Sequence, residues 1–227
     1  MDINFYLNLI EREKKETFDK FSKMLIEYNK KYNLTSICDE NGIKIKHFLD
    51  SIIGEKFFAK GANVIEIGSG GGFPSIPLKI IRDDLKFTLV ESTGKKCEYL
   101  KAVVDNFNFD CVQVLNIRAE DGGKNVIHRE KYDAVCARAV ARLNTLCEYC
   151  MPFIKVGGRF IAYKGDAKEE IEEAKNAIKV LGGKILCVEE IELPFEAGKR
   201  NIIVIEKIKN TPSLYPRGNG KERKKPL

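Results

Sequence analysis

The chain has 227 residues, of which 44% are hydrophobic and 32% are charged, and this composition suits one soluble α/β domain with an appendage. No apolar run approaches the roughly 18 residues that a membrane-spanning helix needs, so we expect no membrane segment. The start, Met1-Asp2-Ile3-Asn4, lacks the basic and apolar pattern of a secretory signal, and we therefore expect a cytoplasmic protein.

The net charge of +6 is concentrated near the C-terminal end. Residues 209–227 contain six Lys or Arg and one acid, with several prolines and glycines and few apolar side chains. This composition predicts a flexible basic tail, which suits a polyanionic partner such as nucleic acid. A solubilising disordered end without a partner is the alternative interpretation.

The seven cysteines are dispersed, which fits reduced thiols better than a disulfide framework. Cys147 and Cys150 form a lone CxxC pair. A structural zinc site usually has a second pair of ligands. We therefore interpret both cysteines as ordinary helix residues and expect no metal.

Residues 1–60 are predicted to form an N-terminal helical cap. The apolar side chains of Phe18, Phe21, Leu25 and Tyr28 recur every three or four residues, which is the period of one helix face. Turn-prone residues at 33–36 separate this stretch from a second helical stretch near 40–58.

Residues 61–208 alternate short apolar runs with helical patterns, which predicts a mostly parallel sheet covered by helices on both faces. The expected strands lie at 64–67, 87–90, 112–115, 134–137, 160–163, 185–188 and 202–205. The expected helices lie near 74–82, 94–107, 142–155 and 167–181. No helix separates the last two strands, so they should form an antiparallel hairpin at one edge.

The first expected strand runs into a glycine-rich turn, Glu66-Ile67-Gly68-Ser69-Gly70-Gly71-Gly72. Such glycines allow left-handed torsions and a close approach to a ligand. The dinucleotide pattern GxGxxG fails because its sixth position is Phe73. The pattern acid-x-Gly-x-Gly-x-Gly, which is typical of methyltransferases, matches throughout. The turn therefore predicts a site for S-adenosylmethionine, with Gly68 and Gly70 beside the cofactor.

Three further elements should meet at the same rim of the sheet, where ligands of parallel sheets bind. Glu91 ends the second expected strand and is placed to accept hydrogen bonds from both ribose hydroxyls. A polar loop, Arg118-Ala119-Glu120-Asp121, follows the third strand where adenine should lie, and Arg138 ends the fourth. We expect Arg138 to hold the cofactor side or the acceptor side of the pocket.

Seven segments along the chain form a recognisable series: NLTS at 33–36, KHFLDS at 46–51, IGSGGGFPSIPL at 67–78, KK at 95–96, RAE at 118–120, ARA at 137–139 and YKG at 163–165. Together they resemble a known family, the RsmG (GidB) methyltransferases of small-subunit ribosomal RNA. The resemblance extends in order from about Asn29 to Lys207. The glycine turn alone is generic, whereas the GFPxxPL continuation and the first two segments are specific. One departure is small: Cys136-Ala137 precedes Arg138 where some members have a serine.

The resemblance implies a class I methyltransferase fold, which is Rossmann-like with a seven-stranded sheet. It also implies S-adenosylmethionine as cofactor and methylation of N7 of a guanosine in the 530 loop of 16S rRNA. Carried over by motif, the cofactor contacts are Gly68, Phe73, Ala119, Glu120 and Arg138. The implied partner is 16S rRNA or the small ribosomal subunit, and we expect a monomer.

Candidate substrate contacts follow from position. Asn33 and Thr35 offer short polar groups in a loop that would reach a flipped base, and Arg142 and Lys164 on the rim are candidate phosphate contacts. His47 and Asp50 share one helix face, where we expect them to fasten the cap to the main domain.

N7 of guanine has a lone pair and no proton, so no general base is required and no catalytic residue is predicted. A class I methyltransferase of another RNA, a protein or a small molecule is the main alternative. An NAD-dependent oxidoreductase fails on the glycine spacing, and an RNA-binding module with an inactive fold remains a third reading.

Overall fold

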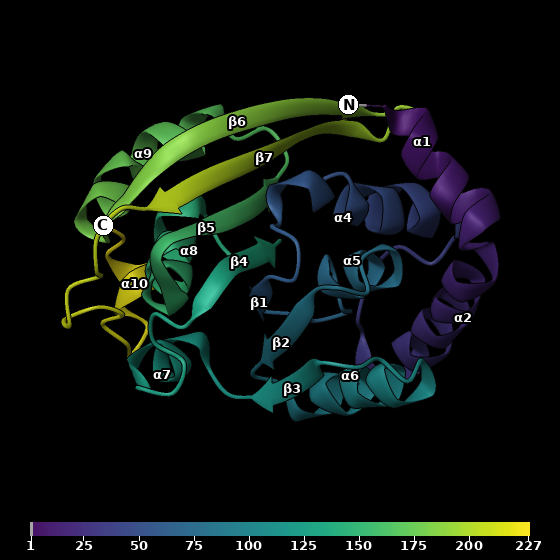
Figure 1. Cartoon of the computed structure of the whole chain (residues 1–227), viewed down its shortest axis with the longest axis horizontal. Coiled ribbons are helices and arrows are strands. Elements are labelled where there is room, and N and C mark those ends of the chain that lie inside the picture. Colours follow the sequence, from purple (N-terminus) through teal and green to yellow (C-terminus); the bar gives the residue numbers. More distant parts are fainter. Residues whose placement is uncertain (1) are drawn as a thin grey trace.

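The core of the protein is one seven-stranded sheet with helices on both faces (Figure 1). The computed structural model describes residues 2–227. Its strands are β1 (Asn63–Ile67), β2 (Lys86–Glu91), β3 (Val112–Asn116), β4 (Tyr132–Arg138), β5 (Ile154–Lys164), β6 (Gly183–Leu193) and β7 (Gly198–Lys207). Neighbouring strands from β1 to β5 pair in parallel, and β7 runs antiparallel to both β5 and β6. The predicted mostly parallel sheet with an antiparallel edge hairpin is confirmed.

The strand order, β3-β2-β1-β4-β5-β7-β6, reverses direction between β1 and β4. From β1 the chain moves outward through β2 to β3, and it then returns to place β4 on the other side of β1. Such a switch point leaves a crevice outside the carboxyl ends of the two central strands. The glycine turn follows β1 and Arg138 ends β4, so the topology places both at this crevice.

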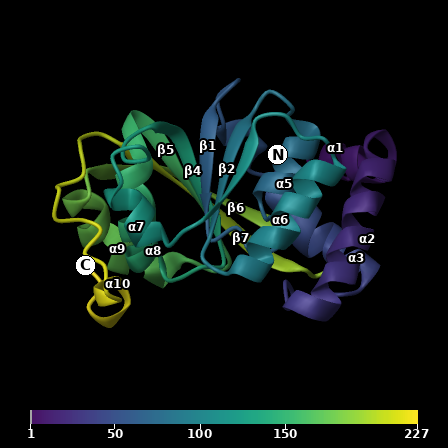
Figure 2. The ribbon, with the colours of Figure 1, turned by 90° about the horizontal axis from the view of Figure 1, so that it is seen from below.

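Two groups of helices cover the two faces of the sheet, and Figure 2 shows them on either side of the strands. One group contains α1 (Ile3–Asn8), η1 (Leu9–Glu13), α2 (Lys15–Tyr32), α3 (Glu40–Gly42), η2 (Ile43–Leu49), α4 (Asp50–Ile52), η3 (Glu55–Phe57), α5 (Ser75–Ile81) and α6 (Gly94–Asn106). The other contains α7 (Ala119–Lys124), α8 (Leu143–Cys150), η4 (Met151–Phe153), α9 (Lys168–Val180) and α10 (Lys221–Lys224). Across residues 2–227, no helix combines the length and apolar character needed to cross a bilayer.

The N-terminal helices share one hydrophobic core with the sheet. The predicted apolar face of α2 is buried at Phe18, Phe21 and Leu25. The rings of Phe21 and Phe48 lie 5.6 Å and 6.4 Å from the ring of Phe73, which follows the glycine turn. Because these aromatic rings pack together, the N-terminal helices are joined to the turn by buried apolar surface.

Two local expectations were wrong. The helix predicted over 142–155 ends at Cys150, because a short 3₁₀ turn containing Pro152 follows it and β5 already begins at Ile154. The polar loop expected at 118–121 is instead the start of helix α7, for which Arg118 is the N-cap residue. Its acidic first turn, with Glu120 and Asp121, is stabilised by the helix dipole.

The expectation of a flexible C-terminal tail was also wrong, because residues 209–227 pack against the helices of one face. Thr211, Pro216 and Glu222 are buried, and Arg217 forms an ion pair with Glu148 on α8. Composition predicted disorder because the segment has few apolar side chains. The structure instead holds the segment with polar contacts to distant residues. Among them, Glu222 contacts Thr145 and Arg217 contacts Glu148, which are 77 and 69 residues away in sequence.

The two CxxC cysteines, Cys147 and Cys150, lie buried on α8, and burial raises the pKa of both thiols. Within residues 2–227, no group of three or more His, Cys, Asp or Glu side chains is arranged to hold a metal ion. Both thiols are buried packing residues of α8.

Candidate active site

A cleft of about 920 Å³ opens at the switch point between β1 and β4. Ligand sites of small molecules typically have volumes of about 300–1,000 Å³. The cleft is bordered by the glycine turn, by the ends of β2 and β4, by the first turn of α7 and by the loop that precedes α3. All seven residues predicted to bind the cofactor line it: Gly68, Gly70, Phe73, Glu91, Ala119, Glu120 and Arg138.

Four N–H groups of the glycine turn donate hydrogen bonds to the turn itself or to the end of β2. Gly68 and Ser69 donate to the carbonyl of Val90 at 2.9 Å and 3.0 Å, and Gly72 donates to the carbonyl of Ser69 at 2.6 Å. Gly70 donates to Oε2 of Glu91 at 3.0 Å. Because four N–H groups of the turn already have acceptors, most of its donors are not available to a pyrophosphate. This geometry agrees with the exclusion of a dinucleotide.

Glu91 lies at the end of β2 with 7% of its surface exposed and borders the cleft. Its Oε1 accepts a hydrogen bond from the N–H of Thr93 at 2.8 Å, and its Oε2 accepts the one from Gly70. Each carboxylate oxygen can accept a second hydrogen bond. Glu91 is thus held rigidly by the backbone while it keeps acceptor sites for a ligand's hydroxyl groups.

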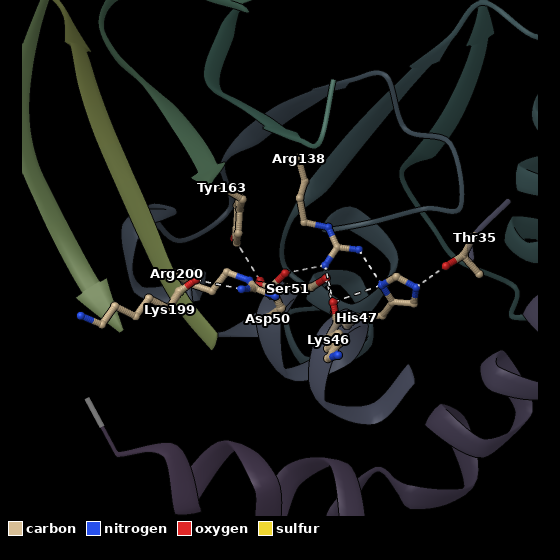
Figure 3. Close-up of polar contacts among 9 residues, drawn as sticks. All are labelled: Thr35, Lys46, His47, Asp50, Ser51, Arg138, Tyr163, Lys199 and Arg200. Atoms are coloured by element: carbon tan, nitrogen blue, oxygen red, sulfur yellow. Dashed lines mark hydrogen bonds and ion pairs between the residues drawn. The ribbon is translucent and has the colours of Figure 1, made fainter. Parts of the chain in front are cut away.

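Arg138, at the end of β4, joins the sheet to the N-terminal helices (Figure 3). Its Nη1 donates to Oδ2 of Asp50 at 2.8 Å and to the carbonyl of Lys46 at 2.9 Å. Its Nη2 donates to Nδ1 of His47 at 3.0 Å. Asp50 also accepts a hydrogen bond from Nε of Arg200 on β7, at 3.1 Å. His47 and Asp50 therefore fasten the N-terminal helices as expected, although they do so through Arg138.

Phe73 is placed between these groups. Its ring stacks on the imidazole of His47, with centroids 4.4 Å apart and an interplanar angle of 18°. The guanidinium carbon of Arg138 lies 4.9 Å from the centroid of the same ring. A cation over an aromatic face is a favourable contact. The ring thus connects the glycine turn to the Arg138 contacts, and its remaining exposed edge borders the cleft.

Comparison with known proteins identifies the family. A family model described as "rRNA small subunit methyltransferase G" (GidB) matches residues 14–203. The chain belongs to this family. A relative of that name from Brevibacillus brevis is 48% identical over 224 residues, covering 97% of this chain and 94% of the relative. Another, from Alkaliphilus metalliredigens, is 47% identical over 210 residues, covering 91% and 88%.

The GidB family member also has the fold of S-adenosylmethionine-dependent methyltransferases. The solved structure of M. jannaschii TYW2 in complex with AdoMet matches with a TM-score of 0.54 and 17% identity, covering 70% of this chain and 77% of that one. A methyltransferase from Pyrococcus furiosus matches with a TM-score of 0.54 and 17% identity, covering 70% and 81%. The predicted class I methyltransferase fold is confirmed.

The cleft fits S-adenosylmethionine, which is the cofactor of this fold. Most N–H groups of the turn already have acceptors, and the cofactor has no pyrophosphate that would need them. A Cβ atom added at Gly70 would meet only the carbonyl oxygen of Gly68, at 3.8 Å, so the backbone there faces open cleft. Glu91 offers carboxylate lone pairs where ribose hydroxyls require acceptors.

The predicted substrate contacts are placed less uniformly. Thr35 borders the cleft, whereas Asn33 is an exposed residue with a φ of 49° at the end of α2 and does not. Arg142 forms an ion pair with Glu173 at 2.8 Å, and Lys164 forms one with Glu170 at 2.7 Å. Neither side chain borders the cleft, because acids on α9 that the sequence does not reveal as neighbours hold both cations away from it.

Some residues of the site were not predicted. Asn29 holds the loop that carries Thr35: its Oδ1 accepts hydrogen bonds from the N–H groups of Leu34 and Thr35, at 2.6 Å and 2.9 Å. Val140 also borders the cleft. Its side chain packs against Gly68, where an added Cβ atom would lie only 2.7 Å from Cγ2 of Val140. The position of Val140 just after the fourth strand was the signal that would have indicated it. Nothing in the sequence indicates that Gly218, Asn219, Gly220 and Arg223 also border the cleft.

The acid that opens the glycine motif does not face the cofactor. Glu66 is completely buried, does not border the cleft, and its two carboxylate oxygens have no hydrogen-bond partner within residues 2–227. Burial raises the pKa of this carboxyl group from 4.5 to about 8. Glu66 is therefore not placed to contact the amino group or sulfonium of a cofactor in the cleft.

The protonation of Glu66 makes stability depend on pH. A carboxyl whose pKa is raised by folding binds a proton more tightly in the folded state, so unfolding becomes easier as pH rises from 4.5 through about 8. Glu66→Gln should remove this dependence and should raise the thermal midpoint at pH 8 while changing it little at pH 4.5. Thermal unfolding across this pH range checks the prediction. An equal shift at both pH values would contradict it.

Proposed function

We propose that this protein transfers a methyl group from S-adenosylmethionine to N7 of a guanosine in the 530 loop of 16S rRNA. The observation that carries the proposal is the single cleft in which the glycine turn, Glu91 and the first turn of α7 meet the loop of Thr35 from the N-terminal helices. A cofactor site on one side and a polar loop on the other leave room for an acceptor base between them. The GidB family match supplies the class of acceptor.

The cofactor, when bound, supplies an electrophilic methyl group on a sulfonium. N7 of guanine attacks through its own lone pair, so the protein does not need to remove a proton. The site then accelerates methyl transfer by positioning the base and by excluding water. His47 is not available as a base, because burial and the neighbouring charge of Arg138 lower its pKa from 6.5 to about 3.

The Arg138 contacts determine which hydrogen bonds Thr35 can make. A guanidinium only donates, so we assign Nδ1 of His47 as the acceptor from Arg138 rather than as a donor to the carbonyl of Lys46, 3.1 Å away. The proton of the neutral ring is then on Nε2. Nε2 then donates to Oγ1 of Thr35 at 2.7 Å, and the N–H of Ile37 donates to the same oxygen at 3.0 Å. Both lone pairs of the hydroxyl are occupied, and its hydrogen is left to donate.

A hydroxyl donor at this place distinguishes guanine from adenine. Beside N7, guanine presents the acceptor O6, whereas adenine presents the donor N6–H₂. Thr35 borders the cleft, and its hydroxyl hydrogen suits an acceptor. We therefore assign Thr35 to O6 of the target guanine. Asn33 is exposed outside the cleft, so we propose that it contacts RNA next to the target base rather than the base itself.

Thr35→Val should lower the rate of methyl transfer to rRNA by about tenfold, because one hydrogen bond to the base is lost. Binding of S-adenosylhomocysteine should be unchanged, and Thr35→Ser should keep most of the rate. Single-turnover transfer of labelled methyl groups, with calorimetric titration of S-adenosylhomocysteine, measures both quantities. Full turnover by the valine variant would refute the assignment.

The activity itself is tested by incubating the protein and labelled S-adenosylmethionine with 30S subunits, with protein-free 16S rRNA and with ribosomal proteins. We expect label in 16S rRNA, and mass spectrometry of nuclease fragments should locate N7-methylguanosine in the 530 loop. Label in another nucleotide, or in protein, would overturn the proposal. Comparison of rRNA from cells with and without the gene provides the matching test in vivo.

A further inference from the structure

The C-terminal segment, residues 211–227, forms one wall of the cofactor cleft. We call it the C-terminal strap. It crosses the outside of α7 and α8 and contains the short helix α10 (Figure 1, yellow). Gly218, Asn219, Gly220 and Arg223 from the strap border the same cleft as the glycine turn. A segment expected to be a loose tail is therefore part of the site.

A buried ion pair fixes the strap. Glu148 on α8 is 1% exposed, and its Oε2 lies 2.7 Å from Nη2 of Arg217. Its Oε1 accepts hydrogen bonds from both Nε and the backbone N–H of Arg217, at 2.9 Å and 2.8 Å. This forked pairing has the geometry that makes arginine–carboxylate contacts strong and specific. The Arg217–Glu148 pair is a latch that determines where the following residues lie.

Three further contacts hold the strap after the latch. The buried Glu222 accepts a hydrogen bond from the N–H of Gly218. Its backbone carbonyl accepts a hydrogen bond from Oγ1 of Thr145 on α8, at 3.0 Å. Lys124, at the end of α7, donates to the carbonyl of Arg217 at 3.2 Å. Together these contacts hold the strap where Arg223, like Lys124, borders the cleft.

Three exposed cations at this mouth have no acid partner among the residues that the structure describes. Arg118, Lys124 and Arg223 are exposed and border the cleft. No carboxylate within residues 2–227 forms an ion pair with any of the three. By contrast, Arg142 and Lys164 are paired with acids on α9. Unpaired cations around a cleft attract a polyanion.

The charge around these three residues is also positive overall. α10 adds the exposed Lys221 and Lys224, and Lys225 follows it. Asp121 is the exposed acid that borders the cleft, whereas Glu120 is half-buried and Glu91 is buried. The phosphates of a nucleic acid strand entering the cleft would meet mainly positive charge here.

We propose that Arg118, Lys124 and Arg223 form a phosphate-binding rim for the RNA strand that flanks the target guanosine, and that the Arg217–Glu148 latch holds this rim in place. The inference rests on the proposed function, since it requires an RNA substrate. It replaces Arg142 and Lys164 as the main phosphate contacts. Arg217 is a positioning residue, because its own charge is neutralised by Glu148.

The rim is tested with the triple variant R118Q/K124Q/R223Q in the full-length protein. A matched control, K15Q/K155Q/K175Q, removes three exposed cations that are paired with acids away from the cleft. Binding of a 16S rRNA transcript is measured between 50 and 200 mM salt. The rim variant should bind roughly tenfold or more weakly at 50 mM, and the slope of log K against log salt should fall by about two to three. The control should change neither.

The latch is tested with Arg217→Gln. Its slope should fall by about one, although Arg223 is still present, because Arg223 is no longer held at the rim. Arg223→Gln alone should produce the same change, so a folding defect in the first variant does not leave the idea untested. Equal RNA binding by the wild type, the rim variant and the Arg223 variant would overturn the inference. If the wild type neither binds nor methylates 16S rRNA, the proposed function fails instead.

Discussion

Replacing Arg138 by alanine is expected to lower the free energy of unfolding by about 3 kcal/mol, because the buried carboxylate of Asp50 loses its main partner. The side chains of Arg138 and Asp50 are only 12% and 6% exposed. Arg200 remains beside Asp50, which keeps the loss at the low end of the range for a broken buried pair. The variant should therefore fold, with a lowered thermal midpoint.

The same change should reduce methyl transfer by at least about 100-fold, since small displacements of catalytic geometry have effects of this size. Without Arg138, Nδ1 of His47 loses its donor, the ring proton is free to change position, and the hydroxyl of Thr35 is no longer restricted to donating. Single-turnover assays below the unfolding transition separate this effect from lost stability.

Arg200→Ala is the matched control for Arg138→Ala. Arg200 forms an ion pair with the same carboxylate, with Nε and Oδ1 of Asp50 3.1 Å apart, but it does not border the cofactor cleft. We expect a smaller loss of stability and a turnover near that of the wild type. Equal damage to turnover by both variants would show that the effect arises from disturbing Asp50 and would remove the special role of Arg138.

Gly70→Val should abolish measurable binding of S-adenosylmethionine and S-adenosylhomocysteine while leaving the protein folded. Around a Cβ at Gly70 the nearest atom within 4 Å is the carbonyl oxygen of Gly68, at 3.8 Å, so the added side chain would extend into the open cleft. We expect affinity to fall by at least about 100-fold, because the side chain takes the space of the ligand. The φ of +50° adds a stability cost of about 1–3 kcal/mol.

Gly61→Val separates backbone strain from blocking of the cleft. Gly61 has a φ of +69°, and a Cβ there would meet no atom within 4 Å. It precedes β1 and does not border the cleft. Its substitution should therefore cost similar stability and leave cofactor affinity unchanged in calorimetric titration. Full cofactor affinity in the Gly70 variant would show that the cofactor lies away from the glycine turn.

The cofactor half of the site was predictable because its signals are local. Glu91 and Arg138 each end an apolar run, and parallel strands place their carboxyl ends along one edge of a sheet. The glycines of the turn predicted left-handed backbone torsions, and the structure has them, with φ of +74° at Gly68 and +50° at Gly70. Position along the chain was therefore enough to bring these residues together.

The charged contacts were not predictable in this way. Arg142 and Lys164 looked like free cations, but the fold places Glu173 and Glu170 beside them. Glu66 opens the glycine motif, yet the alternation of side chains along β1 points it into the core rather than toward the cleft. Whether a charge is free or paired depends on neighbours that are distant in sequence.

The sequence by itself determined the fold class, the order of strands and helices, the glycine turn and the resemblance to a family of rRNA methyltransferases, because periodicity and motifs are properties of neighbouring residues. Only the tertiary structure decided that Arg138 holds His47 and Asp50, and that the C-terminal strap is latched by Arg217 onto Glu148. Their partners lie 69 to 91 residues apart in the chain. Such contacts are selected by packing and by the need to pair buried charge, which no local pattern records.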